Sequence, residues 1–357
     1  MTVTSSIQEM LAELAGLCAG RPEMQLMEVC GTHTVSLFRS GIKSMLPGNL
    51  RLISGPGCPV CVTAQGYIDA AGELAQRPGV TVCTYGDMVR VPGRGGSLAE
   101  RRGQGARVVV VYSARDALGY AIEHPEEQVV FLAVGFETTA PATAATVLEA
   151  RRREVANFSM LMAHKRVVPA MEALLSSGAV PIDGFLCPGH VSVIIGAAAY
   201  APIAQRHGKP CVVAGFEAGQ MLSGVLHLVR QVAAGEARVQ NVYGVVVRDE
   251  GNVAARALMD EAFVPADAVW RGIGVIAGSG LELREPLARF DAARRFGVDL
   301  RGNEEPLACR CGHIILGKLL PADCPLFGQA CTPLHPVGPC MVSSEGTCAA
   351  WYKYGRS

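Results

Sequence analysis

Short apolar runs, separated by glycine-rich turns and helical patterns, constrain the fold of this chain more than any other feature. Val, Leu and Ile dominate runs such as RVVVVYS (107–113) and VVFLAVGF (129–136). Strands that are apolar on both faces are typical of parallel sheets with helices on each side. The pattern therefore predicts an α/β fold. We expect its strands at residues 25–30, 50–54, 80–85, 107–113, 129–136, 158–164, 184–187, 210–216 and 242–247.

A weak internal repeat predicts two similar halves. SGPGCPVCV precedes VCTYGDMV, and LCPGHVSVI later precedes VVAGFEAGQM. In each pair a strand leads into a proline–glycine turn, and the next strand ends near a glycine and an acidic residue. We expect two similar parallel-sheet α/β domains facing each other across a cleft, at residues 41–125 and 126–265. An N-terminal helix and first strand (1–40) are expected to pack with a small cysteine-rich C-terminal domain (266–357).

Reactive or polar side chains follow several of the expected strands. They are Cys30, Cys58, Cys61, Glu137 and His190. Ligands gather at the carboxyl ends of parallel strands, so a cleft between the halves would collect these residues. Glu137 and His190 also suit structural roles, as a helix first-turn acid and a satisfied turn histidine.

Six of the thirteen cysteines lie close to the C-terminus: Cys309, Cys311, Cys324, Cys331, Cys340 and Cys348. The N-terminus lacks the features of a signal peptide, so we expect a cytoplasmic protein, where disulfide frameworks are rare. Four thiolates can hold zinc or a [4Fe–4S] cluster. Wide spacing with intervening prolines favours the cluster, because structural zinc sites usually use paired Cys-x-x-Cys knuckles. Unliganded or disulfide-paired thiols are the third alternative.

Two shorter motifs also carry sulfur chemistry. Cys58-Pro-Val-Cys61 can close a small disulfide, and a helix starting there would lower a thiol pKa. Dithiol redox chemistry is the interpretation we favour over half a zinc site, because no second Cys-x-x-Cys completes one. In MEVCGTHT, Cys30 and His33 suit a soft or borderline transition metal, although both could simply be packed.

Charge and the remaining patterns exclude several functions. Lys plus Arg equals Asp plus Glu, so no overall field attracts nucleic acid or an anionic membrane. The basic stretch 89–109 is either a solvated loop or a partner- or phosphate-binding segment. The pattern Gly272-x-Gly274-x-x-Ala277 is of the dinucleotide-binding type, but we predict a turn because no good helix follows. The chain contains no Gly-x-x-x-x-Gly-Lys-Ser/Thr motif, which disfavours nucleotide binding.

Taken together, MEVCGTHT, GPGCPVC, GFETTAP, PGHVS and the tail CPLFG…CTP…GPCMVSSEG…C resemble the HypD family of [NiFe] hydrogenase maturation proteins. The motifs follow the family's order over nearly the whole chain, from about residue 5 to residue 354. The resemblance implies two α/β domains and a third domain that carries a [4Fe–4S] cluster. It also implies a complex with a HypC-type chaperone, in which iron carries two cyanides and one carbon monoxide. HypE, with HypF, would supply the cyanide.

The resemblance also implies roles for particular residues. Cys30 would bind the iron with His33 beside it, and Cys58 and Cys61 would be a redox pair that relays electrons from the cluster. We expect Glu137 and His190 to lie in the same cleft and to be catalytic together with Cys58, Cys61 and His33. The implied cluster ligands are Cys309, Cys324, Cys331 and Cys348, with Cys311 and Cys340 as a disulfide pair.

Three hypotheses compete at this point. The first is an assembly scaffold for the iron–cyanide–carbonyl group. The second is a cluster-dependent thiol–disulfide oxidoreductase, which gives Cys30 and His33 no metal. The third is a zinc-stabilised binding module, which predicts a colourless protein. Retention of a non-cluster iron that is lost on Cys30→Ala would separate the first hypothesis from the second.

Overall fold

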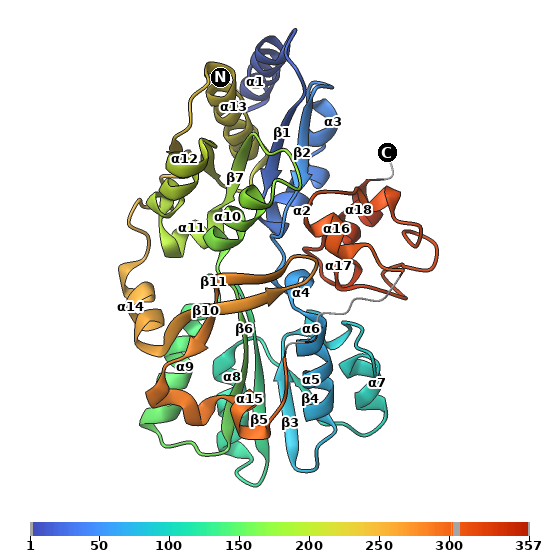
Figure 1. Ribbon diagram of the computed structural model, residues 1–357, viewed down its shortest axis with the longest axis vertical. Coiled ribbons are helices and arrows are strands. Elements are labelled where there is room, and N and C mark those ends of the chain that lie inside the picture. Colours follow the sequence, from blue (N-terminus) through green and yellow to red (C-terminus); the bar gives the residue numbers. More distant parts are fainter. Residues whose placement is uncertain (1–2, 301, 303–307, 356–357) are drawn as a thin grey trace.

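The computed structural model of the chain describes residues 3–300, 302 and 308–355. Two parallel sheets, each covered by helices on both faces, lie one above the other along the long axis (Figure 1). The cysteine-rich C-terminal segment lies beside their junction. The α/β class with two parallel sheets is therefore confirmed.

The first sheet has five parallel strands in the order β2-β1-β7-β8-β9. Its strands are β1 (Met24–Glu28), β2 (Leu50–Ser54), β7 (Gly184–Pro188), β8 (Cys211–Ala214) and β9 (Val239–Asn241). One face is covered by α1 (Val3–Cys18), α2 (Gly31–Arg39), α3 (Ile42–Met45) and α13 (Ala218–Ala234). The other face is covered by α10 (Val167–Ser177), α11 (Gly189–Ile195) and α12 (Ala201–His207).

The second sheet has four parallel strands in the order β4-β3-β5-β6. Its strands are β3 (Val80–Thr84), β4 (Val108–Val110), β5 (Gln128–Gly135) and β6 (Phe158–His164). One face is covered by α5 (Gln65–Ala75), α6 (Gly86–Val89) and α7 (Leu98–Gly103), and the other by α8 (Ala114–Glu123) and α9 (Ala140–Arg152). A capping box of Ser113 and Asp116 starts α8.

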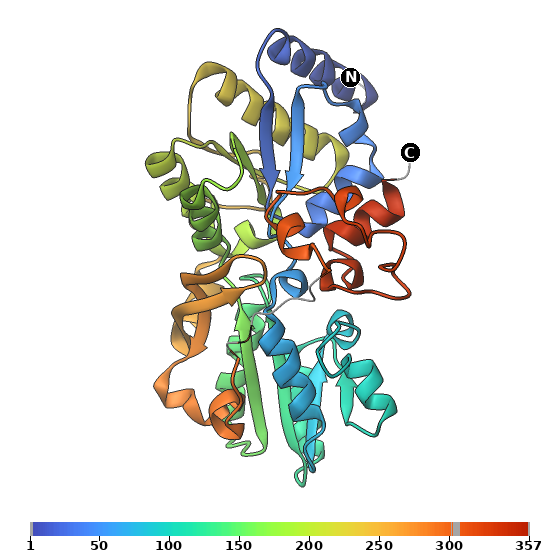
Figure 2. The same cartoon turned by 45° about the vertical axis from the view of Figure 1, so that its right-hand side comes forward.

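An antiparallel hairpin, β10 (Phe263–Trp270) and β11 (Gly274–Leu283), crosses the junction between the two sheets (Figures 1 and 2). Isolated bridges join it to both neighbours: Lys165 at the end of β6 pairs with Gly280, and Thr63 pairs with Trp270. Thr63 directly follows the short helix α4 (Pro59–Val62). The helices α14 (Val253–Ala262) and α15 (Ala292–Phe296) flank the hairpin in sequence.

The C-terminal segment contains α16 (Cys311–Ile315), α17 (Pro339–Val342) and α18 (Thr347–Tyr354). α16 and α17 pack on α4, and α18 packs on α2. Short 3-10 helices cover Ala197–Tyr200, Glu285–Phe290 and Pro321–Asp323. Across the described ranges, every helix is too short or too polar to cross a lipid bilayer.

The sheets are assembled differently from the segments 1–40, 41–125 and 126–265 that the sequence indicated. β2 pairs with β1 and not with β3, and β5 and β6 join β3 in the second sheet. Helix α1 packs against α13 of the first sheet, where Arg230 pairs with Glu13, and not on the C-terminal segment. The first sheet is therefore built from strands that precede and follow residues 80–164. The strands within residues 80–164 form the second sheet.

Two further expectations need correction. Residues 242–247 were expected to be a strand, but they form a turn in which Val245 is fully exposed, and the edge strand β9 lies just before them. Residues 271–273 do form the expected turn, but residues on both sides of it are strands of the hairpin.

Candidate thiol and metal site

Cys30 lies beyond the carboxyl end of β1 and is the N-cap residue of α2. The turn that follows β2 lies directly against it. A β-carbon on Gly57 would lie 2.3 Å from the backbone nitrogen of Cys30, so only glycine permits this approach. The N–H of Gly31 donates to the carbonyl oxygen of Gly57 at 3.1 Å. The two motifs CGTH and GPGC are thereby fixed side by side.

The thiol of Cys30 is buried. Burial raises its pKa to about 11, backbone N–H groups of His33 and Thr32 oppose the shift, and the carboxylate of Glu345 adds to it. Glu345 is held in place by the Thr32 hydroxyl, which donates to it at 2.7 Å. Cys30 therefore carries its proton at neutral pH, and a metal ion that binds there would release the proton.

The His33 ring is fully buried beneath Cys30. Its Nε2 lies 3.0 Å from the carbonyl oxygen of Gly215 and 3.3 Å from that of Ala214. Carbonyl oxygens only accept, so Nε2 carries the hydrogen and Nδ1 has the lone pair. Nδ1 is buried and has no hydrogen-bond partner among the described residues. Burial lowers the pKa of His33 to about 4, so the ring is neutral.

An aromatic stack connects His33 to the exposed histidine of the PGHVS motif. The ring of Phe216 lies 4.8 Å from that of His33 and 4.0 Å from that of His190. The structure thus brings His190 to the site from the carboxyl end of β7, through Phe216 and on the exposed side.

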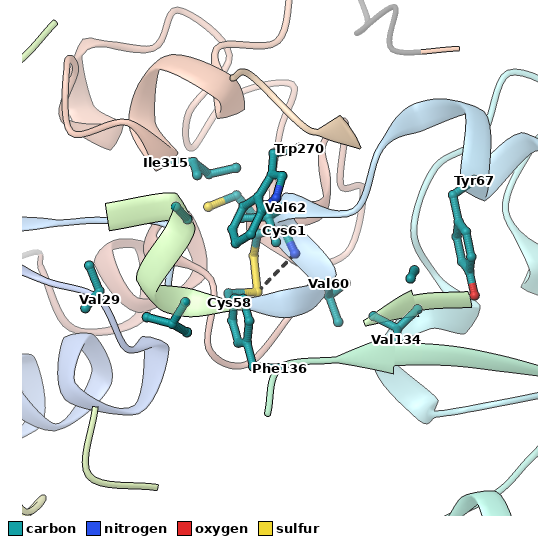
Figure 3. Close-up of a cluster of buried hydrophobic side chains, with 14 of the residues drawn as sticks. Val29, Cys58, Val60, Cys61, Val62, Tyr67, Val134, Phe136, Trp270 and Ile315 are labelled. Carbon is teal, nitrogen blue, oxygen red and sulfur yellow. Dashed lines mark hydrogen bonds between the residues drawn. A yellow bond between two sulfur atoms is a disulfide. The ribbon is translucent and has the colours of Figure 1, made fainter. Parts of the chain in front are cut away.

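A disulfide joins Cys58, the N-cap residue of the four-residue helix α4, to Cys61 within that helix. The N–H of Cys61 donates to the sulfur of Cys58 at 3.1 Å. Both cysteines are buried, and the side chains of Phe136, Trp270 and Ile315 lie around them (Figure 3). The disulfide therefore lies in apolar surroundings beside the junction of the sheets.

One small cavity joins the disulfide to the C-terminal segment. It has a volume of about 10 Å³. The sulfur of Cys61 lies 4.0 Å from the carbonyl oxygen of Pro339, the first residue of α17. The lining includes Gly31, Thr34, Cys58, Cys61, Cys340 and Glu345. This small cavity is therefore bordered by the residue next to Cys30, by both cysteines of the disulfide and by one C-terminal cysteine, Cys340.

The C-terminal cysteines gather in the fold although they are widely spaced in sequence. The sulfurs of Cys311, Cys340 and Cys348 all lie within 4.8 Å of one another, and all three residues are buried. Hydrogen bonds from the other two thiols lower the pKa of Cys340 well below its usual value. Among the three, Cys340 is the one that lines the small cavity beside Cys61.

The other three cysteines adjoin this group. A β-carbon on Gly338 would lie 2.6 Å from the sulfurs of both Cys309 and Cys311. Burial raises the pKa of Cys331, and the sulfurs of Cys309 and Cys324 raise it further. All six cysteines thus lie in one region, and such soft donors from separate loops suit an iron–sulfur cluster.

The grouping differs in detail from the roles that the sequence indicated. Cys311 and Cys340 are not bonded to each other, and they share their triad with Cys348, one of the expected cluster ligands. The ligand set Cys309, Cys324, Cys331 and Cys348 remains a prediction, as does the Cys311–Cys340 disulfide.

Glu137 lies apart from the sulfur groups, on the wall of another cavity of about 610 Å³. Its Oε1 accepts the N–H of Val167, the first residue of α10, at 3.0 Å. Its Oε2 is buried with no hydrogen-bond partner in the described part of the chain. Burial raises the pKa of Glu137 to about 7, and nearby Arg166 opposes the shift. The contact with α10 supports the structural role of a helix-capping acid.

Sequence reasoning missed Glu28, a buried acid two residues before Cys30. Its Oε1 accepts from the hydroxyls of Ser54 at 2.7 Å and Thr34 at 3.1 Å, and burial raises its pKa. The signal was present, because an acid inside the otherwise apolar run QLMEVC is unusual for a buried strand.

Known proteins match this chain over nearly its whole length. The HypD family model, described as "Hydrogenase formation hypA family", matches residues 5–355. The hydrogenase maturation factor HypD of Azotobacter vinelandii is 46% identical over 359 residues, which is 99% of this chain and 95% of the relative.

Two further relatives have the same printed name. The hydrogenase maturation factor HypD of Cupriavidus necator is 48% identical over 92% of this chain and 89% of its own length. That of Escherichia coli is 46% identical over 94% of this chain and 90% of its own length. With a family model that spans nearly every residue and relatives this similar, the chain belongs to the HypD family.

Proposed function

We propose that the chain is a maturation scaffold for [NiFe] hydrogenase that, together with a HypC-type chaperone, holds an iron carrying two cyanides and one carbon monoxide. The observations that carry this proposal are the buried Cys30 thiol at the start of α2 and, three residues later in the chain, the buried Nδ1 of His33, which has no hydrogen-bond partner among the described residues. The names of the relatives, hydrogenase maturation factors, support the biological role.

Cys30 suits a carrier better than a permanent metal site. A single thiolate from this chain, completed by a thiolate of the chaperone, would hold the iron between the two proteins. The iron could then leave when one ligand is exchanged, which a closed site of four protein ligands would not permit. The lone pair on Nδ1 of His33 is available to bind the iron or to accept a hydrogen bond from one of its ligands. His190 lies exposed beyond Phe216, where the cargo or a partner can contact it.

The C-terminal cysteines would hold a [4Fe–4S] cluster, with Cys309, Cys324, Cys331 and Cys348 as ligands. The gathering of six cysteines in this segment supports a cluster there, and the choice of these four ligands is the one that the family resemblance implies. When bound, such a cluster supplies one-electron transfer.

Four further cysteines, Cys58, Cys61, Cys311 and Cys340, would form two dithiols that exchange with each other. The Cys340 thiolate attacks Cys61, and Cys58 leaves as a thiolate and takes up a proton. Cys311 then attacks Cys340 in the mixed disulfide and releases Cys61. Overall, the Cys58–Cys61 disulfide is reduced to two thiols while Cys311 and Cys340 are oxidised to a disulfide. Two electrons and two protons pass, and no outside reductant is needed for this step.

The proposal places further proteins around the scaffold. A HypE-type protein, served by HypF, would deliver cyanide to the iron. Cys18, Cys83, Cys187 and Cys211 form no disulfide, which supports a reducing compartment such as the cytoplasm.

A second candidate function is a cluster-dependent thiol–disulfide oxidoreductase. The contact of the Cys58–Cys61 disulfide with the C-terminal segment favours it, but it leaves Cys30 without a role. The test is the iron content of the chain purified with its chaperone under anaerobic conditions. A scaffold keeps iron beyond the amount that matches acid-labile sulfide, and Cys30→Ala loses only that excess. Equal iron in the wild type and Cys30→Ala would instead favour the oxidoreductase.

A further inference from the structure

The tip of the β10–β11 hairpin is hydrogen-bonded to residues 62–65, at and just after the end of α4. The backbone N–H of Arg271 donates to the carbonyl oxygen of Val62 at 2.9 Å. Its Nε donates to the carbonyl oxygen of Thr63 at 3.0 Å, and its two terminal nitrogens reach Oε1 of Gln65 at 3.2 Å. Arg271 is almost completely buried. The end of α4 is therefore fixed to the hairpin through both the backbone and the side chain of one residue.

The next residue of the same tip touches the C-terminal cysteines. Gly272 has φ +76°, and a β-carbon there would lie 2.3 Å from the Cα of Gly312. Gly312 directly follows Cys311 in α16. The backbone of the hairpin tip therefore packs directly on the backbone of the segment that carries Cys311.

The hairpin is itself held firmly in place. The indole N–H of Trp270 donates to the hydroxyl of Ser279 at 2.7 Å, within the hairpin. The buried Lys165, at the end of β6, donates from its ammonium group to the carbonyl oxygen of Val269 at 2.9 Å. The strands that carry the tip are therefore bound to each other and to the residue that follows β6.

We propose that Arg271 and Gly272 are positioning residues that set the separation between the Cys58–Cys61 disulfide and the C-terminal thiols. This inference rests on the proposed exchange between Cys61 and Cys340. One residue anchors the helix of the disulfide, and its neighbour anchors the segment of Cys311. The distance between the two sulfur groups is thus fixed by two adjacent residues that carry no sulfur.

The geometry of disulfide bonds explains why the distance set by Arg271 and Gly272 matters. A disulfide forms only when the two Cα atoms lie about 4.4–6.8 Å apart. Carbon atoms in contact relax to about 3.5–4.0 Å, so alanine at position 272 would push Gly312 away by about an ångström or more. The sulfurs of Cys311 and Cys340 lie within 4.8 Å of each other, so a displacement of the Cys311 segment moves the Cys340 thiol away from Cys61 and prevents the mixed disulfide.

A trapping experiment tests the spacing directly. The trap variant is Cys58→Ser/Cys311→Ser, in which neither Cys58 nor Cys311 remains to break a Cys61–Cys340 bond. Diamide added to the anaerobic holoprotein takes two electrons and two protons from Cys61 and Cys340 and is reduced to the hydrazine, leaving a Cys61–Cys340 disulfide. Non-reducing peptide mapping detects it. We expect this disulfide in the trap variant and its loss when Gly272→Ala is added to it.

Gly274 provides the matched control. It lies in the same hairpin at φ +97°, but a β-carbon there meets no atom of the described residues within 4 Å. Gly274→Ala therefore adds comparable backbone strain without the contact, and the trap variant with Gly274→Ala should keep the disulfide. If Gly272→Ala fails to fold, Arg271→Gln in the trap variant should show the same loss.

The outcomes distinguish the positioning role of Arg271 and Gly272 from the exchange between Cys61 and Cys340. A disulfide that persists in the Gly272→Ala variant, or is lost equally in both glycine variants, overturns the positioning role and leaves the exchange intact. If the trap variant alone gives no Cys61–Cys340 disulfide, the exchange itself is contradicted, and the positioning role falls with it.

Discussion

The sulfur of Cys61 lies 4.0 Å from the carbonyl oxygen of Pro339, the residue before Cys340. This contact joins a helix that follows β2 to a helix near the C-terminus. The same small cavity is bordered by Gly31, next to Cys30. Three sulfur centres from distant parts of the sequence therefore adjoin, which suits a protein that combines electron transfer with the handling of a metal cargo.

Replacing Cys30 by Ala should abolish hydrogenase maturation and leave the fold and the cluster intact. The loss of one buried sulfur should cost about 1 kcal/mol of stability, as for a deleted core methyl group. Cys83→Ala is the matched control, because Cys83 is buried in β3 away from the site. Maturation measured as hydrogenase activity should survive Cys83→Ala. Normal maturation by Cys30→Ala would sink the iron-ligand assignment.

Cys324 and Cys340 should behave differently toward the cluster. If Cys324 is a ligand and Cys340 belongs to a redox pair, Cys324→Ser should lose the absorbance near about 400 nm from thiolate-to-iron charge transfer. Cys340→Ser should keep it and still fail in maturation. The reverse result would show that the triad Cys311, Cys340 and Cys348 holds the metal. Iron and acid-labile sulfide assays on both variants provide an independent reading.

Glu137 should make the protein less stable as the pH rises. Burial raises its pKa from 4.5 to about 7, so the folded state keeps a proton that the unfolded state loses first. This contribution is complete below about pH 4.5 and is lost as the pH rises through about 7, a change of about 3 kcal/mol. Glu137→Gln cannot ionise, so its thermal midpoint should gain on the wild type between about pH 5 and about pH 8.

Glu172→Gln is the control for this pH profile, because Glu172 lines the same cavity. Its difference from the wild type should not follow the Glu137 profile. Parallel profiles for the wild type and Glu137→Gln would mean that Glu137 is ionised throughout the folded range.

His33 should remain neutral at physiological pH with its hydrogen on Nε2. Its pKa is lowered to about 4 by burial, and the carbonyl oxygens of Gly215 and Ala214 accept from Nε2. Nitrogen NMR of the labelled imidazole should show one tautomer from about pH 5 to about pH 8, whereas an ordinary histidine titrates near 6.5. A titration in that range would remove the free lone pair on which the proposed role of Nδ1 depends.

Strand positions were predictable because their signal is local. The apolar runs that became β5 and β6 are long, continuous and bounded by turns, and Cys30 and Cys58 indeed follow strand ends. Residues 242–247 show the limit of that signal. They are equally apolar, but the amides of Val246 and Val247 donate to Tyr243 and close a turn.

Pairing and proximity were not predictable, because they depend on contacts between distant parts of the chain. Apolar strands carry no mark of their neighbours, so nothing in β2 indicated that it would pair with β1 and leave β3 to another sheet. The closeness of Cys340 to Cys61 and of Gly272 to Gly312 likewise depends on how the hairpin and the C-terminal segment dock. The carbonyl partners of His33 come from the end of β8, far along the sequence.

The most direct test of the central claim is an infrared spectrum of the chain purified anaerobically with its HypC-type chaperone, beside the same preparation of Cys30→Ala. The account predicts bands in the cyanide and carbon monoxide stretching regions in the wild type and their absence in Cys30→Ala, with equal acid-labile sulfide in both. Bands of equal strength in Cys30→Ala would place the iron elsewhere and contradict the account.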